Sequence, residues 1–210
     1  RLREQAELQS RIQALQSRIR PHFLFNSMNI IASLIATDPE TAESVVEDLA
    51  ELFRASLDEA SHQVSLSSEL ALCERYLRIE RLRLGDRLRL DWQVAPIPDG
   101  VRIPLLTIQP LIENAIYHGI QPLPEGGTIG VRVDFPDDRV RVEIRNPLPA
   151  ADAAEPGAQR EGNRMAIGNI RGRLAALHGS AARLESGADG PWYRTVLQYP
   201  YRGSARGDSG

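Results

Sequence analysis

His22 and Asn26 are the first residues whose type and spacing suit chemistry. They lie four residues apart in a segment whose apolar spacing predicts a helix, so both side chains share one polar face. An exposed imidazole is a competent nucleophile for phosphoryl transfer, and the Asn26 amide can hydrogen-bond a ring nitrogen and fix its tautomer. The competing interpretation is an ordinary surface histidine beside the helix kink that Pro21 introduces. Periodicity alone favours that second interpretation.

A second polar cluster lies on a helix predicted over 105–118. Glu113, Asn114, Tyr117 and His118 follow helical spacing there, opposite an apolar face. A carboxylate beside an amide can hold a hydrated Mg²⁺ ion, although a solvated polar face is the simpler interpretation. A third segment, Gly162–Leu174, contains a glycine turn before a helix and could present N–H groups to an anion.

The composition of the 210 residues excludes several kinds of site. All 25 basic residues are arginine, so no lysine is present for a P-loop, a protein-kinase strand or a Schiff base. The net charge of −3 gives no case for direct nucleic-acid binding. The single cysteine, Cys73, is expected to be a small core residue. The four histidines lack metal-ligand spacing, so we predict no zinc site.

The N-terminal third is predicted to be helical. Residues 1–20 carry a narrow apolar stripe that is typical of a coiled-coil helix. Residues 21–64 are predicted to form a helical hairpin, whose second helix begins at Asp38-Pro39-Glu40, an N-cap followed by a first-turn proline and an acid. The hairpin has more apolar surface than it can bury alone. Two copies would form a four-helix bundle in a dimer.

Residues 65–202 are predicted to form one α+β domain, with a mixed sheet covered by helices on one face. The aperiodic stretch 147–165 is expected to be a lid, and the Gly/Ser-rich tail 203–210 is expected to be disordered. The predicted helices are 67–84, 105–118 and 166–178, and the predicted strands are 88–94, 128–135, 139–146, 181–187 and 192–199.

Taken together, four segments resemble the LytS/YehU-type sensor histidine kinases, most closely their AlgZ branch. Residues 21–26 (PHFLFN) are similar to the phosphoacceptor box of that family, and residues 76–88 to the segment that leads into its ATP domain. Residues 109–119 look like its N-box, and residues 169–174 like its G-box helix. The resemblance implies a dimerising helical hairpin followed by a GHKL-type (Bergerat) α/β sandwich that binds ATP and Mg²⁺.

The resemblance also implies a role for each matching residue. His22 would take the γ-phosphoryl group of ATP and pass it to an aspartate of a response regulator, commonly one with a LytTR DNA-binding domain. Asn114 would ligate Mg²⁺, Asn146 would read the adenine amino group, and 1–20 would be a coupling helix. A membrane sensor region, absent from this chain, would make it the cytoplasmic part of a bacterial inner-membrane protein. The remaining nucleotide-site candidates are Glu113, Tyr117, His118, Arg164, Gly168 and Asn169.

The sequence departs from the family pattern at residues expected to contact the nucleotide and at the residue expected to act as general base for His22. Asn146-Pro147-Leu148 replaces the usual Asp-x-Gly, and Tyr117 stands where a basic residue is usual. Phe23 follows His22, where many other histidine kinases carry an acid, so Glu113 is a base candidate only if it reaches His22. Two functions therefore remain open: an active autokinase, or a degenerate kinase that serves as a dimeric scaffold or phosphatase. A nucleotide-hydrolysing enzyme is disfavoured, because Pro110 replaces the carboxylate that would activate water.

Overall fold

A computed structural model describes residues 21–58, 62–149 and 157–201, with the backbone alone for 157–166. The predicted coupling helix 1–20, the kink before Pro21 and the tail 203–210 lie outside the described residues. No helix within the described ranges is long and apolar enough to cross a membrane.

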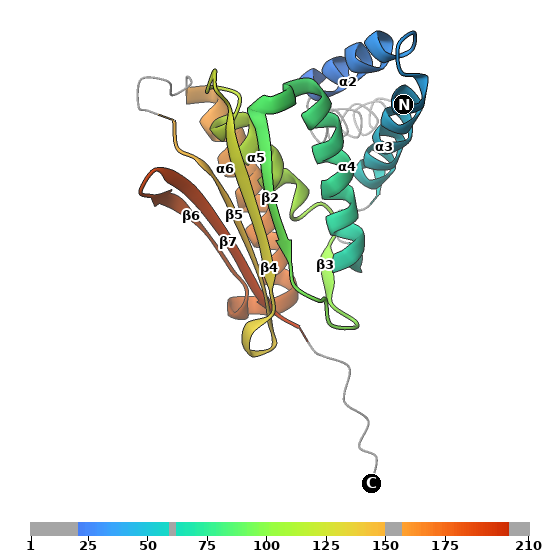
Figure 1. The fold of residues 1–210 in the computed structure, drawn as a ribbon. Coiled ribbons are helices and arrows are strands. Elements are labelled where there is room, and N and C mark those ends of the chain that lie inside the picture. Colours follow the sequence, from blue (N-terminus) through green and yellow to red (C-terminus); the bar gives the residue numbers. More distant parts are fainter. Residues whose placement is uncertain (1–20, 59–61, 150–156, 202–210) are drawn as a thin grey trace, which may run out of the picture.

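Helices α2 and α3 form the predicted hairpin. Helix α2 spans Pro21–Leu34 and helix α3 spans Pro39–Leu57 (Figure 1). Asp38 caps α3 as predicted, because its carboxylate accepts hydrogen bonds from the Thr41 backbone N–H at 3.1 Å and from the Thr41 hydroxyl at 2.6 Å. These hydrogen bonds lower the pKa of the Asp38 carboxyl. The helix start is therefore encoded locally.

The hairpin leaves a row of large apolar side chains exposed. Packing between α2, α3 and the next helix buries only one side of each helix. Single exposed apolar residues are common on protein surfaces, but a row of them on two paired helices is not. The row is therefore typical of a surface that another protein surface covers. The exposed residues are Phe25, Met28, Ile35, Val46 and Leu57.

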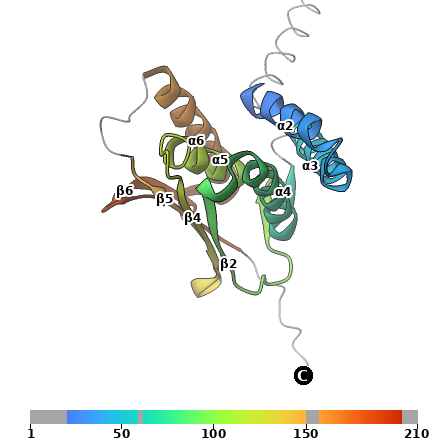
Figure 2. The same cartoon turned by 45° about the horizontal axis from the view of Figure 1, so that its top comes forward.

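The rest of the chain is a two-layer α/β sandwich. Five strands pair in the order β2-β4-β5-β7-β6, with β2 parallel to β4 and the other pairs antiparallel. Figure 2 shows helices α4, α5 and α6 as a layer over one face of this sheet. The predicted α+β class, with a mixed sheet covered on one face, is confirmed. The bounds are α4 Leu66–Leu84, β2 Leu88–Val94, α5 Gln109–Gly119, β4 Gly127–Asp134, β5 Arg139–Pro147, α6 Gly157–His178, β6 Arg183–Asp189 and β7 Trp192–Pro200.

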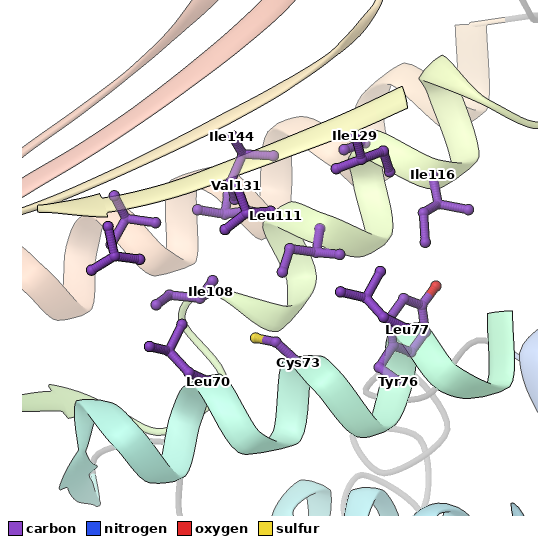
Figure 3. Close-up of a cluster of buried hydrophobic side chains, with 14 of the residues drawn as sticks. Leu70, Cys73, Tyr76, Leu77, Ile108, Leu111, Ile116, Ile129, Val131 and Ile144 are labelled. Atoms are coloured by element: carbon purple, nitrogen blue, oxygen red, sulfur yellow. The ribbon is translucent and has the colours of Figure 1, made fainter. Parts of the chain in front are cut away.

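The core lies between α4, α5 and the sheet. Cys73 is fully buried there, as predicted. Figure 3 shows Cys73 and Leu77 of α4 pointing toward the apolar side of α5, with Ile129 and Val131 of β4 beyond it. Burial raises the pKa of the Cys73 thiol well above its usual range, so the thiol stays protonated and packs as an apolar group.

Three sequence predictions were wrong in detail. The helix predicted from residue 105 begins at Gln109, and two short strands, β1 (Gln63–Ser65) and β3 (Arg102–Pro104), pair antiparallel before it. The segment 105–108 cannot be helical, because Leu106 has a φ of +56°. Helix α6 begins at Gly157, so the irregular part of the predicted lid is shorter than 147–165.

Contacts from two other helices hold the segment before α5. The buried Glu69 carboxylate of α4 accepts hydrogen bonds from the backbone N–H groups of Leu106, Thr107, Ile108 and Gln109, at 2.7–3.3 Å. From the other side, the Arg173 guanidinium of α6 donates to the Leu105 and Leu106 carbonyls at 2.7 and 2.8 Å. Both groups bind backbone atoms, so the residue types at positions 105–108 do not predict these contacts.

Candidate functional site

His22 lies at the exposed N-terminal end of α2. The Asn26 amide lies 3.2 Å from His22 Nδ1, the contact expected from the four-residue spacing. The contacting atom of Asn26 is its amide nitrogen Nδ2, which donates, so Nδ1 accepts and the ring proton is on Nε2. With Nδ1 occupied by Asn26, Nε2 is the nitrogen left for reaction.

A cleft joins His22 to helix α5, which carries the segment that resembles an N-box. Three helices contribute to it, so residues far apart in the sequence face the same space. The arrangement brings Glu113, the base candidate from the sequence, into the same cleft as His22. The residues that line the cleft are His22, Phe23, Asn26, Tyr76, Glu80, Arg83, Glu113, Tyr117 and Gln121.

An aromatic contact holds α2 against α4 beside this cleft. The rings of Phe23 and Tyr76 lie with centroids 4.9 Å apart, and both side chains are buried. Such ring pairs add stabilisation beyond their buried area. Because Phe23 follows His22 and Tyr76 lies one helical turn before Glu80, the ring contact holds the imidazole above the C-terminal half of α4.

Glu80 is among the cleft residues that the sequence did not mark as site candidates, although it lies in the segment that resembles the lead into the ATP domain. Its carboxylate is 2% exposed and accepts hydrogen bonds from the Arg83 guanidinium, one of them from Nε at 3.1 Å. Burial raises the pKa of the Glu80 carboxyl, and the nearby positive charges of Arg83 and His22 oppose that shift. The sequence feature that could have identified Glu80 is an acid on the buried face of an amphipathic helix, three residues before an arginine.

The other two candidate residues of α5, Asn114 and His118, do not line the cleft. Asn114 and His118 are half-buried, and the Tyr117 and His118 rings meet edge to face at 5.1 Å. At the end of α5, a Cβ atom on Gly119 would lie 2.3 Å from Nδ2 of Asn146. The missing side chain at Gly119 therefore lets α5 lie directly against Asn146 of β5.

Asn146 is buried in this contact, with 4% of its surface exposed. Its Nδ2 donates a hydrogen bond to the Pro147 carbonyl at 2.8 Å. The side-chain oxygen is thus the atom with which Asn146 can accept a hydrogen bond from a ligand. Leu148, which replaces the usual glycine, is exposed beyond it.

The candidates on α6 do not line the cleft. Gly168 and Asn169 lie on an exposed part of α6, and the side chain of Arg164 is outside the described residues. Arg171 donates to the Leu184 carbonyl of β6 at 2.9 Å, which ties its guanidinium to the sheet. The structure therefore joins α2, α4 and α5 into one site, and it places the predicted G-box residues elsewhere on the surface.

The donors near α5 suit a magnesium ion only in part. No group of three His, Cys, Asp or Glu side chains that could hold a metal occurs within the described ranges. Mg²⁺ prefers oxygen ligands and keeps much of its shell as water and substrate phosphate, so one amide oxygen from the protein is compatible with it. The donor set thus fits a phosphate-bound Mg²⁺ ion rather than a metal held by the protein alone.

Comparison with known proteins supports the resemblance. The histidine kinase family model matches residues 10–88. Relatives include the sensor histidine kinases YpdA and BtsS of Escherichia coli K12 and the sensor protein LytS of Staphylococcus haemolyticus. Their identities are 34, 30 and 31%, over 91, 94 and 86% of this chain and 35, 34 and 33% of the relatives.

A solved structure is also similar to the chain. The nucleotide-free catalytic domain of the histidine kinase ThkA shares 15% identity, covers 66% of this chain and 94% of its own, and superposes with a TM-score of 0.47. The chain spans about a third of the length of the curated relatives it matches. Those relatives match 86–94% of the chain. The chain therefore belongs to the family of LytS-type sensor histidine kinases.

Proposed function

We propose that this chain is the kinase core that transfers the γ-phosphoryl group of Mg-ATP to His22 and then to an aspartate of a response regulator. The observation that carries the proposal is the cleft in which His22 and Asn26 of α2 face Glu113 and Tyr117 of α5. In this family α5 corresponds to the N-box, so the phosphoacceptor and the nucleotide-binding helix share one space. Phosphoryl transfer depends mainly on positioning and charge neutralisation, which such a cleft can provide.

The nucleotide would be held by residues on both sides of α5. Asn114 would contribute its side-chain oxygen to Mg²⁺, and the Asn146 oxygen would accept from the adenine amino group. Tyr117 and His118 would lie along the phosphates, and Glu113 would lie beside Asn114 at the Mg²⁺ ion. Because the guanidinium of Arg171 is held by β6, Arg164 is the better candidate for a cation on the lid, with Gly168 and Asn169 at the start of the G-box.

The rest of the proposal concerns assembly and partners. The exposed apolar row on α2 and α3 would be covered by the same row of a second copy, which would give a homodimer with a four-helix bundle. Residues 21–64 would form the dimerisation and phosphotransfer unit, and residues 65–202 the ATP-binding unit. The partner would be a response regulator of the LytTR type. A sensor region in the membrane would act through the helix of residues 1–20.

The test is phosphorylation from radiolabelled ATP. We expect label on the wild-type protein and none on His22→Gln, because the amide has no nucleophilic nitrogen. His62→Gln is the matched control, since His62 is also exposed but lies outside the cleft. Label that persists in His22→Gln would refute the assignment of His22. A folded wild-type protein that binds no nucleotide at millimolar Mg-ATP would instead favour the scaffold function.

Asn146→Asp tests the adenine contact. The introduced carboxylate cannot donate to the Pro147 carbonyl, so the free protein should lose about 1–3 kcal/mol of stability. A charged acceptor should bind the adenine amine more tightly. We therefore expect a lower melting temperature without ligand, and a larger rise on adding Mg-ATP than in the wild type. An unchanged calorimetric Kd for ATP would show that residue 146 does not contact adenine.

A further inference from the structure

The chain carries no acid next to its phosphoacceptor, since Phe23 follows His22 and its ring is buried against Tyr76. A neutral imidazole that forms an N–P bond while it keeps its proton becomes positively charged. It must lose that ring proton for the phosphorylated ring to be neutral. A group near His22 must therefore accept that proton. Two carboxylates, Glu80 and Glu113, line the cleft together with the imidazole.

We propose that Glu80 is the residue that stabilises the developing charge on His22 and accepts its ring proton. The inference rests on the proposed phosphorylation of His22. The Asn26 amide nitrogen donates to Nδ1, so the ring proton is on Nε2. As this proton moves to the Glu80 carboxylate and then to solvent, the Nε2 lone pair forms the N–P bond, and the bond between phosphorus and the leaving group breaks, with its electron pair going to the leaving group. Glu80 acts through His22, so it is a positioning and proton-accepting residue.

Burial distinguishes Glu80 from Glu113. Glu80 of α4 is 2% exposed, whereas Glu113 of α5 is half-buried. A buried carboxylate interacts more strongly with a nearby charge, because water screens the interaction less. Burial also raises the pKa of the Glu80 carboxyl, which makes it a stronger base than an ordinary glutamate.

Arg83 holds the Glu80 carboxylate in place but leaves one of its oxygens able to accept a proton. Its guanidinium binds one carboxylate oxygen, Oε2, through both of its hydrogen bonds to Glu80. Among the described residues no hydrogen bond engages the second oxygen, Oε1, which leaves it to accept a proton. The Phe23–Tyr76 contact fixes His22 over the same part of α4. His22 and Glu80 line the same cleft, and the positive charge of His22 lowers the pKa of the Glu80 carboxyl.

Glu80→Gln is the direct test. It keeps the shape of the side chain and an oxygen for Arg83, but it removes the base. We expect single-turnover phosphorylation of His22 at pH 7 to slow by about 10–100-fold, with unchanged affinity for Mg-ATP. Glu74→Gln, an exposed acid on the same helix, is the matched control and should leave the rate unchanged.

The pH profile separates a base from a merely structural residue. In the wild type the rate should rise with pH as Glu80 loses its proton, at a pH above that of a free glutamate. Glu80→Gln should lose this inflection. Any inflections that come from Arg83, Glu113 or Tyr117 should remain, because the variant leaves these residues in place. A slower variant that retains the wild-type profile would overturn the proposal.

Phosphoramidate as the donor separates this proposal from the proposed kinase activity. This small donor needs no ATP site and releases ammonia, so it reports on His22 and its surroundings alone. Slower labelling of Glu80→Gln than of Glu74→Gln by phosphoramidate would support Glu80 even if ATP gave no label. Equal labelling by phosphoramidate would refute the role of Glu80 even if ATP labelled the wild type.

A second measurement covers the case in which Glu80→Gln fails to fold. His22 is exposed, so His22→Gln should fold, and carboxyl NMR can follow the titration of Glu80 in that variant. Removal of the His22 charge should raise the pKa of the Glu80 carboxyl further, because one of the effects that oppose burial is lost. An identical Glu80 titration in the wild type and in His22→Gln would overturn the proposal.

Discussion

Glu69→Gln should destabilise the protein by about 3 kcal/mol, which is among the largest effects expected for a substitution that preserves shape. The Glu69 carboxylate accepts four backbone N–H groups at the start of α5, with the Thr107, Ile108 and Gln109 donors all on Oε1. An amide offers a single oxygen, and its NH₂ group would face the Leu106 N–H that Oε2 now accepts. The amide also removes a negative charge from the positive end of the helix dipole.

The measurement is denaturant unfolding of the variant beside Glu74→Gln, which changes an exposed acid on the same helix. Burial raises the pKa of the Glu69 carboxyl, and the four N–H donors oppose this shift. Because α5 carries Glu113 and Tyr117 into the cleft, phosphorylation of His22 should also slow. Equal stability of the two variants would show that Glu69 does not hold the segment before α5.

Asp48→Ala should lower the free energy of unfolding by about 2 kcal/mol. It should also weaken the contact between α3 of the hairpin and α4 of the sandwich. Asp48 is buried on α3 and accepts hydrogen bonds from Arg75 and Arg78 of α4, at 2.6–2.8 Å. The hydrogen bonds to Asp48 raise the pKa of the Arg78 guanidinium. Both arginine side chains are partly exposed and can rehydrate, so the loss is smaller than for a fully buried pair. His22 should then be held less firmly over α4.

Glu51→Ala is the matched control for Asp48→Ala. It removes the Glu51–Arg54 ion pair of the same helix, whose side chains are largely exposed, and an exposed pair contributes little. Urea unfolding and single-turnover phosphorylation of both variants should separate the two positions. If Asp48→Ala phosphorylates at the wild-type rate, the contact between α3 and α4 does not position His22.

The local elements could be predicted because their causes lie close in the sequence. The Asp38 cap acts on Thr41, three residues away, and the contact between Asn26 and His22 follows from helical spacing. Strands such as β2 and β4 alternate in burial, and the predicted bounds of the strands of the sheet are right to within one or two residues. The start of α5 was mispredicted because Glu69, more than thirty residues earlier, determines it.

The sequence by itself determined which residues can do chemistry and on which helix faces they lie. Only the tertiary structure decided that Glu80 of α4 and Glu113 of α5 lie in the cleft of His22, and that Asn146 lies against Gly119. Periodicity fixes the direction of a side chain around its own helix axis, whereas the distance between two helices depends on contacts such as Phe23–Tyr76 and Asp48–Arg78. These contacts join residues 30 or more positions apart, so no local pattern records them.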